Sequence, residues 1–242
     1  MDLSVSPDGR WIAFTANFND KWDICMMEAR GGACRRLLKS PENEYNPSWF
    51  PDGKRVCAAR TTGGTMKLVI LSREGGAEEI IDLGVSLPAA FPEVSPDGKR
   101  IAFVGSDAAG HPQTYDLYLW EMEDPAAPGK GTLKRLTQNE VMDTDPSFSP
   151  DGKRILYTCN AEGNDDIWMV NADGTDARCV LARPGQDLAP VFSPDGKKAA
   201  FAAFSDPNKG GADAEIWTLD LTTKTVEQLT SNDKKDLKPR WR

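Results

Sequence analysis

The sequence predicts an all-β protein, a β-propeller of four-stranded antiparallel blades, because one turn sequence occurs five times along its 242 residues. The turn reads Pro-Asp-Gly after Ser, or after Phe in the second copy. The copies lie at Ser6–Gly9, Phe50–Gly53, Ser95–Gly98, Ser149–Gly152 and Ser193–Gly196. Their Asp residues are spaced by 44, 45, 54 and 44 residues, which matches propeller blades and exceeds the period of ankyrin or tetratricopeptide repeats. The chain therefore contains five repeats.

The turn itself predicts a strand on each side. Pro at the second position presets φ, and Gly at the fourth accepts the left-handed conformation that closes a tight hairpin. An apolar run follows every turn, and it lacks the polar alternation of a half-exposed strand. These runs are Trp11–Phe14, Val56–Ala59, Ile101–Val104, Ile155–Thr158 and Ala199–Ala202. We expect them to be inner strands that are buried on both faces between neighbouring sheets.

Two more strands complete each repeat. The third strands are expected at Asp23–Cys25, Lys67–Val69, Asp116–Tyr118, Asp166–Trp168 and Glu215–Trp217. A Gly-bearing turn precedes the fourth strand in the first four repeats. The fourth strands are expected to end at Leu37, Ile81, Leu136, Leu181 and Leu229.

The unbroken period predicts one domain over residues 1–242. The repeats cover about residues 1–40, 41–84, 85–139, 140–183 and 184–232. Residues 233–242 are either the start of a further blade or a closing strand, because Pro239–Trp241 resembles the blade opening at Pro47–Trp49. Leu3–Val5 already supplies that strand to the first repeat. This leaves two interpretations, five blades with a redundant strand or part of a six-bladed ring, and we favour five blades.

These motifs carry a family resemblance that extends over nearly the whole chain. The segment Ser95–Phe103, the Asp166–Trp168 strand and Arg135–Thr137 placed before Pro146–Pro150 resemble the TolB-type propeller repeat. The resemblance is specific for the fold and weak for function. The same repeat occurs in periplasmic TolB, in propeller domains of prolyl-oligopeptidase-like and tricorn-like proteases, and in stand-alone binding proteins. The resemblance implies a periplasmic or cell-envelope location, and a cytoplasmic one stays open.

Charge and hydropathy limit the class of partner. The formal net charge of -8 argues against nucleic acid, which is bound through clustered Lys and Arg, and favours a protein or a basic peptide segment. The apolar runs have strand length, so no membrane insertion is expected. The N-terminus, Met1–Leu3, enters the first repeat without the basic and apolar lead of a signal peptide.

The residues also predict no catalysis and no cofactor. The five cysteines form no Cys-x-x-Cys unit, so a zinc site is not expected, and they are interpreted as small hydrophobes. Cys25 and Cys34 lie on consecutive strands of one hairpin, which leaves a cross-link open. The single histidine, His111, lies in a loop, and the chain has neither a Gly-x-Ser-x-Gly elbow nor a phosphate-binding glycine loop.

Blade topology places the variable loops on one face. The repeated turns lie on one face of the propeller, whereas the connections between second and third strands and the crossovers between blades lie on the other. Recognition in repeat proteins commonly uses loops of variable length. The candidate binding residues on this loop face are His111, Asn160, Asp165 and Asp206.

The crossovers carry a second regularity. An acidic residue stands three positions before each blade-opening Pro except at Ala89. The series consists of Glu44, Asp143, Asp187 and Asp236. These acids are expected near the mouth of the central channel, where they would attract a basic or N-terminal peptide segment or, less favoured, hold calcium. The alternative is that each acid caps backbone N–H groups of its own turn.

The function expected from the sequence is a non-catalytic, TolB-like scaffold that binds a protein or peptide through the loop face around the channel mouth. The alternative is an accessory propeller of a serine peptidase whose catalytic domain lies outside this chain. A third interpretation, an enzyme acting on sugars, requires a metal ion or a carboxylate pair in a deep pocket.

Overall fold

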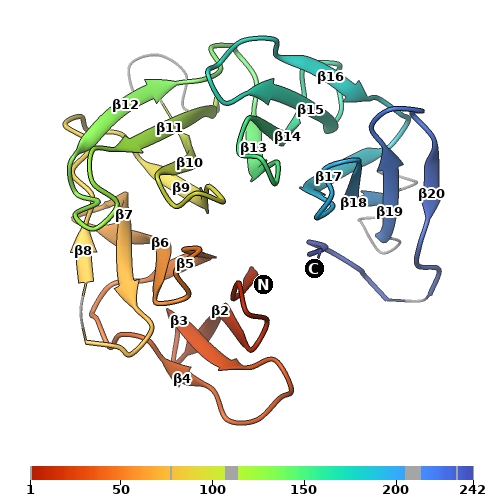
Figure 1. The fold of residues 1–242 in the computed structure, drawn as a ribbon. Coiled ribbons are helices and arrows are strands. Elements are labelled where there is room, and N and C mark those ends of the chain that lie inside the picture. The colour runs from red at the N-terminus through yellow and green to blue at the C-terminus, as the bar shows by residue number, and fades with distance from the viewer. Residues whose placement is uncertain (1, 77, 107–113, 205–213, 233, 242) are drawn as a thin grey trace. The chain divides into compact units, whose positions relative to one another are not determined.

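The computed structural model describes residues 2–76, 78–106, 114–204, 214–232 and 234–241. These residues form β-strands and contain no helix (Figure 1). The strands assemble into five separate four-stranded antiparallel sheets, each a meander of consecutive strands. The predicted all-β propeller fold with five four-stranded blades is confirmed.

The strand bounds follow the sequence repeats. Blade 1 contains β1 (Leu3–Val5), β2 (Trp11–Phe18), β3 (Lys21–Glu28) and β4 (Arg35–Arg36). Blade 2 contains β5 (Glu44–Trp49), β6 (Arg55–Thr62), β7 (Thr65–Ser72) and β8 (Glu78–Ile80). Blade 3 contains β9 (Ala89–Val94), β10 (Arg100–Gly105), β11 (Asp116–Met122) and β12 (Gly131–Arg135). Blade 4 contains β13 (Asp143–Phe148), β14 (Arg154–Cys159), β15 (Asp166–Asn171) and β16 (Arg178–Leu181). Blade 5 contains β17 (Gln186–Phe192), β18 (Lys198–Phe204), β19 (Glu215–Asp220) and β20 (Val226–Gln228).

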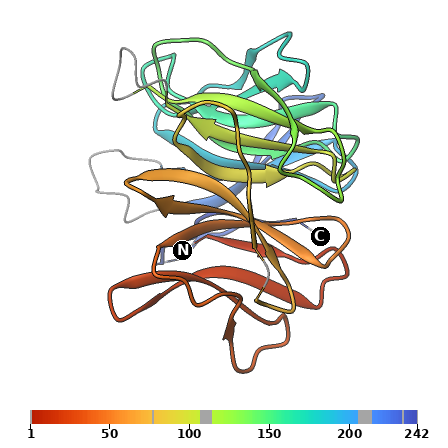
Figure 2. The ribbon, with the colours of Figure 1, turned by 90° about the vertical axis from the view of Figure 1, so that its left-hand side faces the viewer.

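The chain divides into two compact units. Residues 1–112 and 118–134 form unit 1, and residues 113–117 and 135–242 form unit 2. Within unit 1, the turns of the β2–β3 and β6–β7 hairpins lie on the same side (Figure 2). That all five repeats act as one domain stays a prediction. Residues 239–241, which resemble a blade opening in sequence, form no strand.

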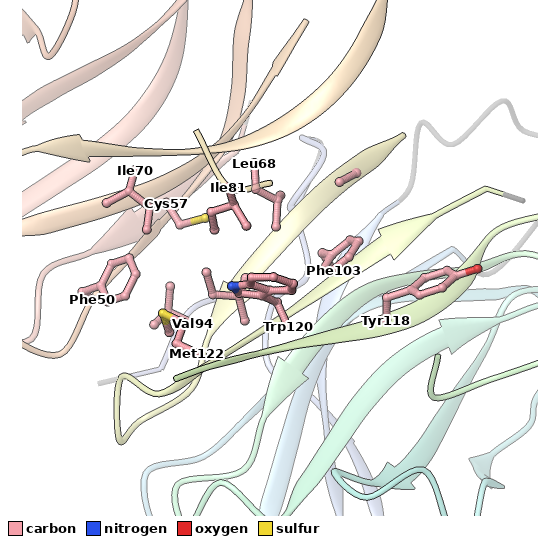
Figure 3. Packing of buried hydrophobic residues seen from close by; sticks show 12 residues of the cluster. Phe50, Cys57, Leu68, Ile70, Ile81, Val94, Phe103, Tyr118, Trp120 and Met122 are labelled. Atoms are coloured by element: carbon pink, nitrogen blue, oxygen red, sulfur yellow. The ribbon is translucent and has the colours of Figure 1, made fainter. Parts of the chain in front are cut away.

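The second strands are buried as their apolar runs predicted. In β6, β10 and β14 the five residues that follow the first residue of the strand are all buried. Between blades 2 and 3, Phe50, Cys57 and Leu68 pack with Phe103 and Trp120 in one apolar cluster (Figure 3). A second cluster in unit 1 joins blade 1 to blade 2, and a third in unit 2 joins blade 4 to blade 5. Because each cluster draws on two consecutive sheets, a blade buries its apolar surface only against its neighbour.

The repeated turns satisfy their own polar groups. In the fourth turn Ser149 Oγ donates to Asp151 Oδ1 over 2.6 Å and accepts from Arg154 N over 2.9 Å. Gly152 has φ of 67°, the left-handed conformation that the turn prediction required, and its N donates to the Ser149 carbonyl. The same set of bonds occurs at the first, third and fifth turns. We call this end of each blade the turn end and the opposite end the loop end.

Candidate functional site

Unit 2 contains three pairs of carboxylates at the loop ends of blades, and one bridging residue joins the two members of each pair. In blade 3, Asn139 donates its backbone N to Asp116 Oδ1 over 3.2 Å and its Nδ2 to Asp143 Oδ2 over 2.9 Å. Asp116 opens the third strand and Asp143 opens the next blade. We call this arrangement the carboxylate clasp, since one residue holds both acids. It links the end of one repeat to the start of the next.

The clasp recurs with different bridging residues. In blade 4, Arg183 donates its backbone N to Asp166 Oδ1 over 3.3 Å. Its guanidinium forms a bidentate pair with Asp187, at 3.1 Å from Nε and 2.6 Å from Nη2. In blade 5, Asn232 joins Glu215 and Asp236 in the same way, at 2.8 Å to each. In all three clasps the bridging residue stands four positions before the crossover acid.

Glu44, the crossover acid of unit 1, lies in the interior. Its side chain is 0% exposed, and Oε1 accepts from Arg60 Nη2 over 2.9 Å and from Ser40 Oγ over 3.0 Å. Oε2 accepts from the backbone N of Ile24 over 3.4 Å. Ser40 again stands four positions before the acid. Glu44 therefore ties the β5 strand to the preceding blade from within the protein.

The acidic series is thus divided by burial. Glu44, Asp143 and Asp187 are buried, whereas Asp236 is partly exposed. Burial raises the pKa of Asp143, which hydrogen bonds from Cys159, Thr137 and Asn139 partly offset. Burial likewise raises the pKa of Asp187 against the opposing effect of its pair with Arg183. The three buried acids are thus bonded within the fold, mainly to side chains rather than to backbone N–H groups of their own turns. Whether the series binds a ligand stays a prediction.

A further regularity that the sequence analysis missed lies one residue before each blade-opening Pro. There the backbone has φ between 50° and 54°, although a residue before Pro is usually extended and non-Gly residues rarely adopt positive φ. The five residues are Asn46, Phe91, Asp145, Ala189 and Lys238. The strand register shifts at the same place in blades 2, 3, 4 and 5. Asn46 and Asp145 were the sequence signal for this conformation, because Asn and Asp tolerate positive φ better than other non-Gly residues.

Threonine hydroxyls of the preceding blade hold two of these strained positions. Thr15 Oγ1 accepts from the N of Asn46 over 3.3 Å, and Thr158 Oγ1 accepts from the N of Ala189 over 3.1 Å. Both threonines are buried in second strands. In unit 2, Lys238 Nζ also lies 3.4 Å from Asp145 Oδ1, so two residues of this set form an ion pair.

Two of the predicted loop residues line one pocket. Asn160 and Asp165 border a hollow of about 340 Å³ at the loop end of blade 4. Its other lining residues are Gly163, Asn164, Gly185 and Gln186. The hollow lies between the β14–β15 connection and the crossover into blade 5, whose backbones are joined by a 2.7 Å bond from Asp187 N to the Asp165 carbonyl. We call it the blade-4 pocket. His111 and Asp206 lie outside the described residues.

A second hollow, of about 500 Å³, occurs at the crossover from blade 2 to blade 3. This crossover carries Ala89 instead of an acid, and the third strand carries Lys67 where other blades have Asp or Glu. The lining includes Ile80 and Val85, which are 42% and 58% exposed. This hollow is therefore more apolar than the blade-4 pocket.

Metal ligands and membrane-spanning helices are not found in the part of the chain that the structure describes. No group of three or more His, Cys, Asp or Glu side chains there is arranged to hold a metal ion. None of the described segments forms a helix with the length and hydropathy needed to cross a bilayer. The five cysteines are free thiols, and Cys25, Cys57 and Cys159 are buried.

Comparison with known proteins agrees with the fold and the repeat. No family model matches the chain. The Tol-Pal system protein TolB of Bordetella pertussis is 28% identical over 168 residues, which cover 69% of this chain and 36% of that protein. The match thus spans about a third of the length of this curated relative.

Solved structures show the same architecture at lower identity. A protein of Agrobacterium tumefaciens assigned to TolB superposes with a TM-score of 0.81 at 21% identity, covering 99% of this chain and 84% of that one. A puromycin-hydrolyzing peptidase of Mycobacterium tuberculosis superposes with a TM-score of 0.68 at 14% identity, covering 95% of this chain and 39% of that one. Such likenesses describe the fold alone. From its repeated turns, its five four-stranded sheets and these comparisons, the chain is a TolB-like β-propeller.

Proposed function

We propose that this chain is a non-catalytic scaffold that binds a protein or peptide partner through the loop ends of its blades. The observation that carries the proposal is the difference between the two blade ends. Four of the five turns at the turn end share one set of internal bonds, so they offer a uniform surface. The loop ends differ in connection length; for example, the connection covers residues 19–20 in blade 1 and residues 160–165 in blade 4.

The chemistry of the loop ends supports binding over catalysis. The clasp carboxylates are held by hydrogen bonds within the fold, and Asp143 and Asp187 lie in the interior. A general acid or base must reach a substrate proton, which these buried and bonded groups do not. The similarity to TolB supports a periplasmic location and protein partners for this chain.

Paired charge-reversal variants test which blade end binds. Asp20→Lys with Glu162→Lys changes two exposed acids at loop ends, whereas Glu28→Lys with Glu121→Lys changes two exposed acids at turn ends. Both double variants alter the net charge equally. Each would be used to capture partners from envelope and cytosolic fractions. We expect the native chain and the turn-end variant to retain the same partner and the loop-end variant to lose it. Loss by the turn-end variant alone would refute the assignment.

A second candidate function is supported by the match to the puromycin-hydrolyzing peptidase, of which this chain covers 39%. The chain would then be the accessory propeller of a hydrolase. A parent gene that continues into a domain with a Gly-x-Ser-x-Gly elbow would decide for this function.

A further inference from the structure

The blade-4 pocket has an unusual balance of hydrogen-bonding groups. Its Asn164 donates Nδ2 to Asp166 Oδ1 and to the carbonyls of Arg183 and Gly185, at 2.7 to 3.0 Å. Gln186 donates Nε2 to Asp165 Oδ2 over 3.0 Å. The side-chain nitrogens of both carboxamides are therefore bonded within the fold, which leaves their carbonyl oxygens as acceptors.

Asp165 adds a negative charge to these acceptors. Its Oδ2 is occupied by Gln186, and among the described residues no donor bonds its Oδ1. Burial raises the pKa of Asp165, the bond from Gln186 partly offsets this, and the neighbouring Asp145 raises the pKa further. Lys238 forms an ion pair with Asp145, and among the described residues no ion pair joins a Lys or Arg to Asp165. The carboxylate of Asp165 thus lacks a positive partner of its own within the described residues.

The pocket is a local departure from the repeat. The amides of Asp143, Asp187 and Asp236 donate to the carbonyls of Tyr115, Asp165 and Ala214, respectively, so these three acceptors are equivalent positions. Blade 4 alone of the three places a carboxylate there. The residue before the crossover acid is Gln186 in blade 4, whereas it is Met142 or Lys235 in the others. A feature present once on a repeating scaffold is not required by the fold, which points to recognition.

We propose that the blade-4 pocket binds a primary ammonium group of a peptide partner, either a lysine side chain or a free N-terminus. An ammonium has three donors, and the residues that line the pocket carry three such acceptors, Asp165 Oδ1 and the carbonyl oxygens of Asn164 and Gln186. Arginine is disfavoured because its advantage is bidentate pairing with a carboxylate, and one oxygen of Asp165 is already bonded to Gln186. The proposal rests on the proposed peptide-binding function and names the group recognised.

The pocket geometry also fits a chain end or a long side chain. Gly163 and Gly185 have φ of 98° and 106°, and a Cβ added at Gly163 would meet no atom within 4 Å. The loop is therefore open at this point. A hollow of about 340 Å³ exceeds the space that one ammonium occupies, so it also accommodates the methylene stem that carries the group.

The test is a titration of the ¹⁵N-labelled chain followed by NMR at the amides of Gly163 and Gly185. The probes are Nα-acetyl-lysine methylamide, alanine methylamide with a free N-terminus, Nα-acetyl-arginine methylamide and the Nε-acetylated form of the lysine probe. We expect shifts with one or both ammonium probes, and the tighter of the two identifies the source. Equal binding of the arginine or the Nε-acetylated probe, or no shift with either ammonium probe, would overturn the proposal.

Variants of Asp165 complete the test. Asp165→Asn removes the charge and keeps the shape, and Asp165→Ala installs the residue found at the equivalent position 214, which the fold already accepts. Each should weaken ammonium binding by roughly tenfold or more, as expected for a lost charged hydrogen bond. The control Glu227→Gln removes one exposed charge in the same unit and should leave binding unchanged. Unaltered affinity in both Asp165 variants would refute the role of Asp165 in ammonium binding.

The outcome is separable from that of the proposed function. Capture of a partner that survives Asp165→Asn, together with no NMR response, would keep the scaffold function and reject this pocket. NMR binding of the ammonium probes without any captured protein would keep the pocket and count against the scaffold function.

Discussion

Replacing Glu44 with Ala should lower the free energy of unfolding far more than replacing Asp236 with Ala, although the two acids occupy the same position in the repeat. Glu44 is 0% exposed and pairs with Arg60, whose side chain is 4% exposed. Replacing Glu44 with Ala leaves a buried guanidinium without this carboxylate, which costs about 3–5 kcal/mol. It also removes acceptors for Ser40 Oγ and Ile24 N. Asp236 is partly exposed, and a substitution at such a surface site changes stability by roughly 0.5 kcal/mol or less.

The difference is measurable by thermal unfolding followed by circular dichroism. For a chain of this size, each kcal/mol lowers Tm by about 2–4 °C, so Glu44→Ala should lower Tm by about 6–20 °C. Asp236→Ala should lower it by at most about 2 °C.

Replacing both members of the pair provides the control for Glu44. The double variant Glu44→Met with Arg60→Met also removes the buried guanidinium charge, so it should recover most of the stability that Glu44→Ala loses. A Glu44→Ala variant as stable as Asp236→Ala would refute the structural role assigned to Glu44, and it would return this residue to the set of candidate ligand-binding acids.

Three further predictions concern turns, buried acids and thiols. Gly98→Ala should destabilise by about 1 kcal/mol more than Gly53→Ala in urea unfolding, because both glycines have positive φ but only the Cβ at 98 would meet Pro51, at 2.9 Å. Burial raises the pKa of Asp187 in the folded state, so the native state keeps this proton to higher pH than the unfolded state does. Stability therefore falls as pH rises through the folded-state pKa. Asp187→Asn should flatten the pH dependence of the urea midpoint between pH 4 and neutrality. Iodoacetamide should modify exposed Cys34 in the native protein well before buried Cys25, whose pKa burial raises to about 12, and mass spectrometry of timed samples will show the order. Equal rates at the two thiols would contradict the burial.

The sequence predicted the parts of this fold that depend on local chemistry. Pro and Gly determine the turn at Ser149–Gly152, and the apolar run at Ile155–Thr158 identifies a strand that is buried on both faces. Both signals act within a few residues and recur in each repeat. The blade boundaries followed from them without any long-range information.

The contacts of the candidate site depend on residues that are distant in sequence. Asp143 and Asp116 meet through Asn139, and no standard motif predicts that one residue will bond two acids. The positive φ at Phe91 and Ala189 runs against the usual preference of a residue before Pro, so local propensity predicts the opposite. The blade-4 pocket depends on Asp165 and Gln186, which occur together only once.

The carboxylate clasp has a consequence for how such chains change length in evolution. Its bonds join the end of one repeat to the start of the next through the same backbone positions, whether the bridging residue is Asn139, Arg183 or Asn232. A duplicated or deleted repeat would therefore restore the same connections at its new junction. Gene duplication can then change the number of blades without requiring new polar contacts between repeats, and further substitutions need only adapt the apolar faces of the neighbouring blades.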